Sequence, residues 1–142
     1  TDKLAINKLE KVLIKYYDKL LEAEQYLEDS YDDSDSELEK ESIIKALYNL
    51  HAHLKNLCSI SELVAPLYSK KKTKRWLKRA VKAQKALGQQ LDMIDYQQYY
   101  QSKARSDSAA LYAAGWLNAA SIPIEKATEK HLDKFYDCSV FW

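Results

Sequence analysis

The segment SKKKTKRWLKRAVKAQKALGQQLDMID, residues 69–95, carries two patterns at once. Small, apolar and amide side chains recur every three or four residues, which is the spacing of one face of a helix. The residues on that face are Trp76, Leu77, Ala80, Val81, Gln84, Leu87, Leu91 and Ile94. The stretch therefore predicts a long helix, with Thr73 as a candidate N-cap and with Gly88 at a place where a neighbour packs closely.

The composition of the whole chain agrees with helices. Its 142 residues include two glycines and two prolines, far fewer than turn-rich sheet proteins use. The length suits one domain with a real core, so we expect a single all-α domain over residues 1–142, an antiparallel bundle of about five helices. Because the chain starts at Thr1 and not at a methionine, we also expect it to be a piece of a longer protein.

The N-terminal part predicts one amphipathic helix followed by an acidic connection. Apolar residues from Leu9 to Leu27 recur at spacings of three, four and seven, and we expect this helix to end near residues 26–30. The polar segment that follows predicts a loop. Within it, Ser36 and Glu39 have the spacing of a capping box, in which each side chain satisfies a free backbone N–H.

The remaining helices are marked by prolines and caps. Apolar residues from Ile43 to Val64 predict a helix that stops or kinks near Pro66, because the proline ring cannot join the backbone ladder. Ser106 or Asp107 is expected to open a fourth helix, and Pro123 suits the first turn of a fifth. The core is expected to contain Leu13, Leu20, Leu47, Leu50, Leu54, Leu57, Leu77, Leu87, Leu91, Trp116 and Leu132.

Charge is strongly segregated along a chain whose net charge is only +1. From Glu28 to Glu41 there are eight acidic residues and one lysine, whereas Lys70 to Lys85 contains nine basic residues and no acid. A partner responds to such local fields more than to the average charge. The acidic segment lacks a calcium-binding pattern and is interpreted as a solvated loop or a counterweight to the basic block.

On the long helix the basic residues fall at spacings of four and three, and so form a stripe beside the apolar face. The stripe consists of Lys71, Arg75, Lys78, Lys82 and Lys85. Such a run is usually a solvated face. Here, however, no acidic residue precedes Asp92 to relieve the repulsion between like charges. A polyanion with repeating phosphates is the natural complement, and both interpretations stay open.

The sequence offers no arrangement for catalysis or metal binding. His51 and His53 are two residues apart, so on a helix they point in nearly opposite directions. Neither His131 nor the two cysteines, Cys58 and Cys138, have zinc-ligand spacing, and buried reduced thiols are expected. There is no nucleophile elbow and no phosphate-binding glycine loop. We therefore expect no enzyme activity and no cofactor. Because the sequence contains no membrane span and no secretory signal, we expect the protein to be cytoplasmic.

Residues from Ala46 to Trp142 resemble the C-terminal half of a CHAD domain, the conserved histidine α-helical domain. The first helix, with LIKYYDKLLEAEQYL, is similar to divergent CHAD domains that follow a CYTH-type triphosphatase domain in bacterial inorganic triphosphatases. The segments that carry the resemblance are Ile60–Tyr68, Trp76–Asp95, Ala113–Leu117 and Phe141–Trp142. The resemblance implies an antiparallel bundle whose basic surface binds inorganic polyphosphate or other phosphorylated partners, with catalysis left to a neighbouring CYTH domain.

One departure from the family concerns its second helix. The family's basic pattern there falls on Tyr48, His51, Lys55 and Cys58, and only Lys55 keeps the family's residue type and charge.

Two functions follow from these observations. The first is a non-catalytic module that binds polyphosphate through Lys71, Arg75, Lys78, Arg79 and Lys82, with Lys74 and Lys55. The second is a structural or interaction domain that has lost phosphate binding and positions or dimerises a neighbouring CYTH domain. Nucleic-acid binding is the weaker option, because the recognisable motifs are absent.

Overall fold

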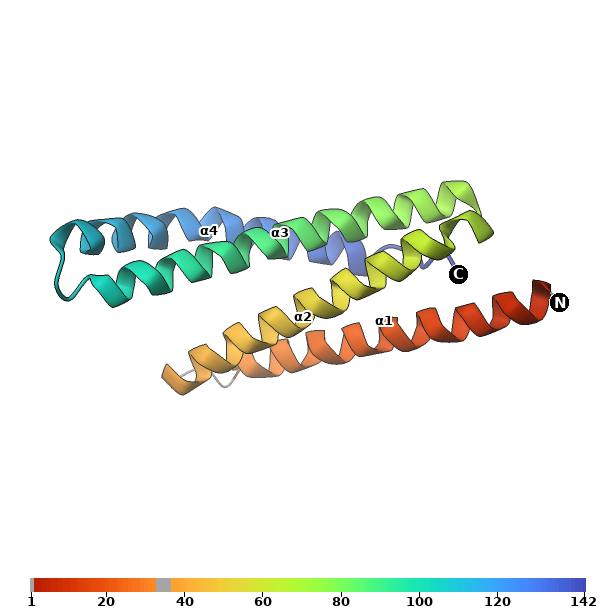
Figure 1. Cartoon of the computed structure of the whole chain (residues 1–142), viewed down its shortest axis with the longest axis horizontal. Helices are drawn as coiled ribbons and strands as arrows, with labels where there is room; N and C mark the ends of the chain where they lie inside the picture. Colours follow the sequence, from red (N-terminus) through yellow and green to blue (C-terminus); the bar gives the residue numbers. More distant parts are fainter. Residues whose placement is uncertain (1, 33–36) are drawn as a thin grey trace.

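Residues 2–32 and 37–142 are described by the structure, a computed structural model. They form α1 (Asp2–Asp32), α2 (Glu37–Val64), the short 3-10 helix η1 (Ala65–Leu67), α3 (Lys70–Lys103) and α4 (Ser108–Tyr136). The all-α prediction is confirmed, and no strand occurs among these residues (Figure 1). The capping box predicted at Ser36 lies outside the described residues.

Residues 2–32 and 37–142 form four long helices, so the expectation of about five was wrong. Pro123 does not begin a helix but lies inside α4, which continues unbroken through it. A proline removes one hydrogen bond, to the carbonyl four residues earlier, which here belongs to Ala119. Pro123 and Ala119 are both exposed. Water can therefore hydrate this carbonyl, and the helix continues.

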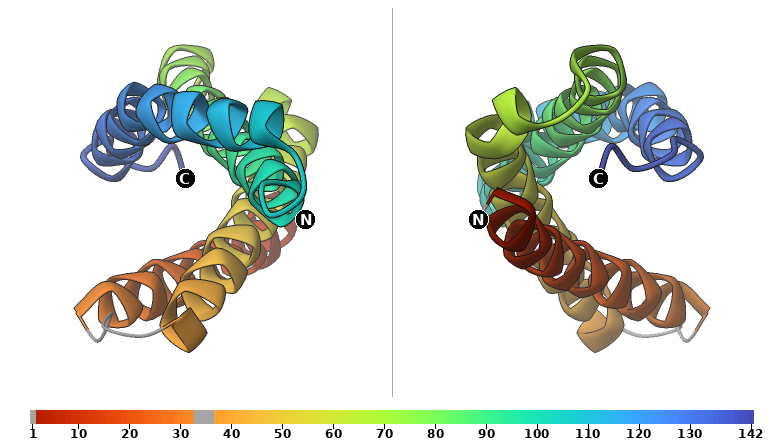
Figure 2. Two further views of the ribbon diagram at one scale, coloured as in Figure 1. Left: turned by 90° about the vertical axis from the view of Figure 1, so that its left-hand side faces the viewer. Right: turned by 90° about the vertical axis from the view of Figure 1, so that its right-hand side faces the viewer.

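The four helices form two hairpins, α1 with α2 and α3 with α4, and α2 packs against α3 to join them. Seen along the long axis, the helices follow an arc that is open between α1 and α4 (Figure 2). Short connections explain the antiparallel order, and Pro66 lies in the η1 turn between α2 and α3, as predicted.

The first residues of α3 and α4 bear on two sequence predictions, of which one was wrong and one is confirmed. The N-cap of α3 is Ser69, so Thr73 is not a cap; it is buried in the first turns, where Oγ1 donates to the Ser69 carbonyl at 2.7 Å. At α4 the N-cap is Asp107, whose Oδ1 accepts from the Ala109 N–H at 2.9 Å. Helix α1 extends to Asp32, slightly past the predicted end.

Most of the predicted core is buried, with two exceptions. Leu77 is half-buried, and Trp116 is 64% exposed, so its assignment to the core was wrong. On α4 the buried side chains near Trp116 are Ala114 and Leu117, which turns Trp116 away from α3. The turn end of the α3–α4 hairpin projects beyond α1 and α2 (Figure 1).

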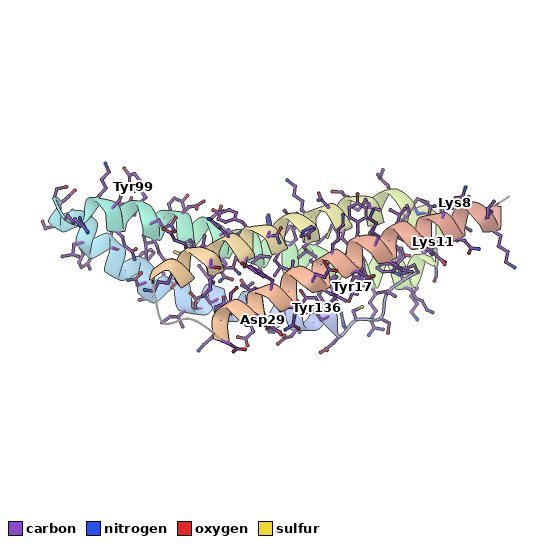
Figure 3. The ribbon with its side chains drawn as sticks, turned by 90° about the horizontal axis from the view of Figure 1, so that it is seen from below. Lys8, Lys11, Tyr17, Asp29, Tyr99 and Tyr136 are labelled. Atoms are coloured by element: carbon purple, nitrogen blue, oxygen red, sulfur yellow. The ribbon has the colours of Figure 1, made fainter. Side chains whose placement is uncertain are left out.

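Trp76 of α3 lies at the centre of an aromatic cluster and is fully buried. The C-terminal tail folds back so that the rings of Phe141 and Trp142 lie 5.2 and 5.5 Å from its centroid. From α1, Tyr17 contacts Trp142 edge-on at 5.6 Å. Nearby, Tyr136 Oη donates to Glu24 Oε2 at 2.9 Å, and Figure 3 shows Tyr17 and Tyr136 close together. These contacts anchor the end of α4 and the start of α3 against α1.

Candidate functional site

The start of α3 separates an apolar face from a basic one. Trp76 and Ala80 are fully buried, whereas Lys78 and Lys82 are exposed. This is the separation that a period of about 3.6 residues produces. Because the apolar face is held by the aromatic cluster, the orientation of the basic face is fixed.

The basic face forms one side of a groove between α3 and α4, with a volume of about 330 Å³. Among the described residues, its lining contains six side chains, all of them basic, and no carboxylate. The residues of this basic groove are Arg75, Lys78, Arg79 and Lys82 from α3, and His131 and Lys134 from α4. The groove therefore concentrates positive charge that no lining residue compensates.

Arg79 is held in place by the end of α4. Its Nη1 donates to the Lys134 carbonyl at 3.2 Å. The last carbonyls of a helix lack partners within the helix. At the end of α4, the Asp137 N–H donates to the Asp133 carbonyl and the Cys138 N–H donates to the Phe135 carbonyl. The Lys134 carbonyl is therefore left to accept from Arg79. A cation near a helix C-terminus also interacts favourably with the helix dipole. The half-buried Arg79 is thus a positioned element of the groove.

His131 lies in the groove as a half-buried imidazole. Burial lowers its pKa below the usual value, and the nearby cations Lys130, Lys134 and Lys82 lower it further. The unliganded groove therefore holds His131 neutral near pH 7, ready to accept a proton when an anion arrives.

The structure brings together four of the seven residues predicted from sequence: Arg75, Lys78, Arg79 and Lys82. Lys71 and Lys74 are exposed at the start of α3 but do not line the groove. Lys55, also exposed, belongs to α2 and takes no part in it.

The sequence prediction missed His131 and Lys134. A signal existed in the charges of α4, where Glu125, Glu129 and Asp133 recur every four residues while His131 and Lys134 fall on the opposite side of the helix.

On α2, three of the four positions compared with the CHAD family make contacts within the bundle. Cys58 is buried. Burial, and to a lesser extent the negative charge of Glu62, raises the pKa of its thiol to about 12. Tyr48 donates to Asp95 of α3 at 2.5 Å. His51 is the neighbour of Gly88, where a Cβ would lie 3.4 Å from its Nε2. Burial lowers the pKa of His51, so it adds no charge near neutral pH.

Cys58 and Cys138 are both buried and free, as predicted. Within the described residues, no three His, Cys, Asp or Glu side chains are grouped so that they could hold a metal ion. None of the described helices is both long and apolar enough to cross a membrane.

No protein-family model, curated protein or solved structure matches the chain. The resemblance to CHAD domains therefore stays a prediction.

Proposed function

We propose that this chain is a non-catalytic, CHAD-like helical module that binds inorganic polyphosphate, or another phosphorylated polyanion, in the basic groove. The observation that carries the proposal is the groove's lining: six basic side chains from two helices and no carboxylate among the described residues. The folded chain adds α4 residues to a stripe that the sequence placed on α3 alone.

The groove suits a chain of phosphates better than a single one. Arg75 and Arg79 are one helical turn apart, and a guanidinium can pair two of its N–H groups with phosphate oxygens. Lys78 and Lys82 repeat the positive charge along the same face. Lys134 supplies a cation from the opposite wall. A polyanion can bridge these charges simultaneously, whereas free orthophosphate contacts only a few of them.

A titration at low salt with long-chain polyphosphate, orthophosphate and single-stranded RNA tests the proposal. Polyphosphate should bind most tightly, and its affinity should fall with salt. If about five charges make contact, the logarithmic slope should be about −3 to −4, by analogy with single-stranded nucleic acids. Lys78→Glu with Lys82→Glu should weaken binding more than about tenfold, because two attractive contacts become repulsive.

The matched control is Lys103→Glu with Arg105→Glu. Both residues are exposed at the other end of α3, do not line the groove and give the same change in net charge. Because Lys103 follows Lys82 by 21 residues, or about 30 Å along the helix axis, this control should lose about threefold or less. Equal binding by the parent and the Lys78/Lys82 variant would refute the groove, as would a parent that binds no polyphosphate at low salt.

The interaction-domain alternative is favoured by a different surface. Tyr112 and Trp116 lie one turn apart on α4 and are 80% and 64% exposed, although both are large and aromatic. Contiguous exposed apolar side chains often mark protein interfaces. Sedimentation of the chain, alone and with a CYTH-type triphosphatase domain, tests this function: association that is lost in Trp116→Lys supports it, and a monomer that binds no such domain contradicts it.

A further inference from the structure

A second and larger groove lies on the other side of α4. Its volume is about 790 Å³, and it is lined by residues of all four helices. On α4, Glu125, Glu129 and Asp133 point into it, whereas His131 and Lys134 belong to the basic groove. Helix α4 thus separates two grooves of opposite charge.

This acidic groove has charged walls and an apolar floor. Its described lining contains six carboxylates and one lysine, Lys40. Glu24 and Glu28 form one row on α1, and Glu125, Glu129 and Asp133 form another on α4. Within each row the spacing is four residues, so the carboxylates follow one helix face. The rest of the lining includes six aliphatic side chains, which we call the floor, together with the amides of Gln90, Gln97, Gln98 and Gln101. The floor residues are Leu27, Leu47 and Leu132, which are buried, and Ile43, Ile44 and Ile94, which are half-buried.

The negative charge in the acidic groove is not balanced from within. Burial raises the pKa of Glu24; the hydrogen bond from Tyr136 opposes this, and the neighbouring charges of Glu28 and Asp133 raise the pKa further. Carboxylates on the two walls therefore repel one another. A ligand with positive charge on both flanks would relieve this repulsion.

The arrangement of the helices points to the shape of that ligand. The four helices follow an arc that is open between α1 and α4 (Figure 2), and the two carboxylate rows belong to the helices at the ends of that arc. An aliphatic floor bounded by two parallel charged rows matches a helix with an apolar stripe between basic flanks. A small polyamine can pair with the carboxylates but has no side chains to fill the floor.

We propose that the acidic groove between α1 and α4 binds a cationic amphipathic helix of a partner protein. The apolar stripe of that helix packs on the six aliphatic floor residues. Its Lys or Arg side chains pair with the carboxylate rows on α1 and α4. The bound helix closes the arc and covers Ile43, Ile44 and Ile94, which are only half-buried in the unliganded chain.

The proposal is tested with a synthetic peptide of about 14 residues, roughly four helical turns, with leucines on one face and lysines on both flanks. Fluorescence anisotropy should show saturable binding with one peptide per chain, and circular dichroism should show that the peptide becomes helical. A scrambled peptide of the same composition, which has the charge but no apolar stripe, should bind at least about tenfold more weakly. Spermidine should compete poorly.

Two pairs of substitutions locate the site. Glu125→Gln with Glu129→Gln should weaken peptide binding roughly tenfold, because both carboxylates line one wall. The matched control, Glu22→Gln with Glu62→Gln, removes two exposed carboxylates outside the groove and should change binding less than about twofold. Ile94→Ser tests the floor and should also weaken binding, provided that its thermal unfolding shows a folded chain.

Several results would overturn the proposal. Equal binding of the ordered and scrambled peptides, or effective competition by spermidine, would make the groove a general polycation site. An equal loss in the Glu125/Glu129 and Glu22/Glu62 variants would show that the peptide responds only to net charge. The basic groove is tested separately, because Lys78→Glu with Lys82→Glu should leave peptide binding at least as strong as in the parent.

Discussion

At the scale of single residues, position on a helix face determines what a leucine contributes to stability. Leu54 and Leu63 lie nine residues apart on α2, yet Leu54 is fully buried and Leu63 is 81% exposed. Removing the buried side chain loses its transfer free energy and leaves a cavity, whereas removing the exposed one does neither.

We therefore expect Leu54→Ala to lower the free energy of unfolding by about 2–5 kcal/mol. Leu63→Ala, the same substitution on the same helix, should change it by no more than about 0.5 kcal/mol. Urea denaturation followed by circular dichroism measures both. Similar losses in the two variants would mean that the inward face of α2 has been assigned wrongly.

His131 gives the basic groove a dependence on pH. In the unliganded chain, burial lowers the pKa of His131, and the positive charges of Lys130, Lys134 and Lys82 lower it further. The imidazole is therefore neutral near pH 7. Arg75, Lys78 and Arg79 of α3 line the same groove and add to the positive field. A bound polyanion reverses this field and raises the pKa. Binding therefore takes up a proton, and affinity must rise as pH falls.

The predicted result is tighter polyphosphate binding as pH is lowered from about 7.5 to about 5.5, the range around the ordinary histidine pKa of about 6.5. His131→Gln should remove most of this slope while affinity at the upper pH stays close to that of the parent. His53→Gln is the control, because His53 is half-buried on α2 and does not line the groove. An unchanged slope in His131→Gln would contradict the role given to His131.

At the scale of secondary-structure elements, α4 is continuous through Pro123, where the sequence suggested a new helix. An internal proline costs a helix about 3 kcal/mol or more in unfavourable cases. The exposed position of Pro123 reduces the part of that cost that comes from an unpaired carbonyl. The lost hydrogen bond and the steric clash of the ring remain.

Pro123→Ala should consequently raise the free energy of unfolding by about 1–3 kcal/mol. Pro66→Ala is an informative comparison, because Pro66 lies in the η1 turn and not inside a long helix. Replacing Pro66 increases the conformational entropy of the unfolded chain, so the free energy of unfolding should fall by about 0.5–1 kcal/mol. A loss of stability in Pro123→Ala would indicate that the proline ends one helix and starts another.

The elements that sequence predicted well are those whose apolar period runs unbroken. The inward leucines of α1, α2 and α3 follow from spacing alone. Thr73 was assigned wrongly because a hydroxyl at the fourth position of a helix has the same sequence pattern as an N-cap, whereas its side chain bonds to the carbonyl of Ser69, four residues earlier. Trp116 was assigned wrongly because periodicity identifies a face of a helix without showing whether another helix covers it.

At the scale of the whole molecule, the near-zero net charge conceals two opposed grooves. The sequence identified the part of the candidate site that comes from α3, because Arg75, Lys78 and Lys82 share one face of one helix. The charge pattern of α4 sets Lys134 apart from the acidic face, but it does not show that Lys134 faces the α3 stripe, because this depends on how α3 and α4 pack side by side. The acidic groove was beyond prediction for the same reason, since its walls come from helices about a hundred residues apart in the chain.

This segregation has a consequence for stability in salt. Residues four apart in one row have Cβ atoms about 5–6 Å apart, whereas the opposite charges lie on two sides of a helix about 10 Å across. Repulsion within each groove therefore outweighs attraction between the grooves. Raising the salt concentration from about 10 mM to about 100 mM shortens the Debye length from about 30 Å to about 10 Å, and so weakens the net repulsion.

The unliganded chain should accordingly unfold at a temperature a few degrees higher in about 100 mM than in about 10 mM sodium chloride. Differential scanning calorimetry at neutral pH measures the shift. Lys78→Gln with Lys82→Gln should be more stable than the parent at the lower salt concentration and should gain less from added salt, because part of the repulsion has already been removed. If the parent instead loses stability over this range, then attraction between opposite charges dominates, and the two grooves are balanced by each other across α4.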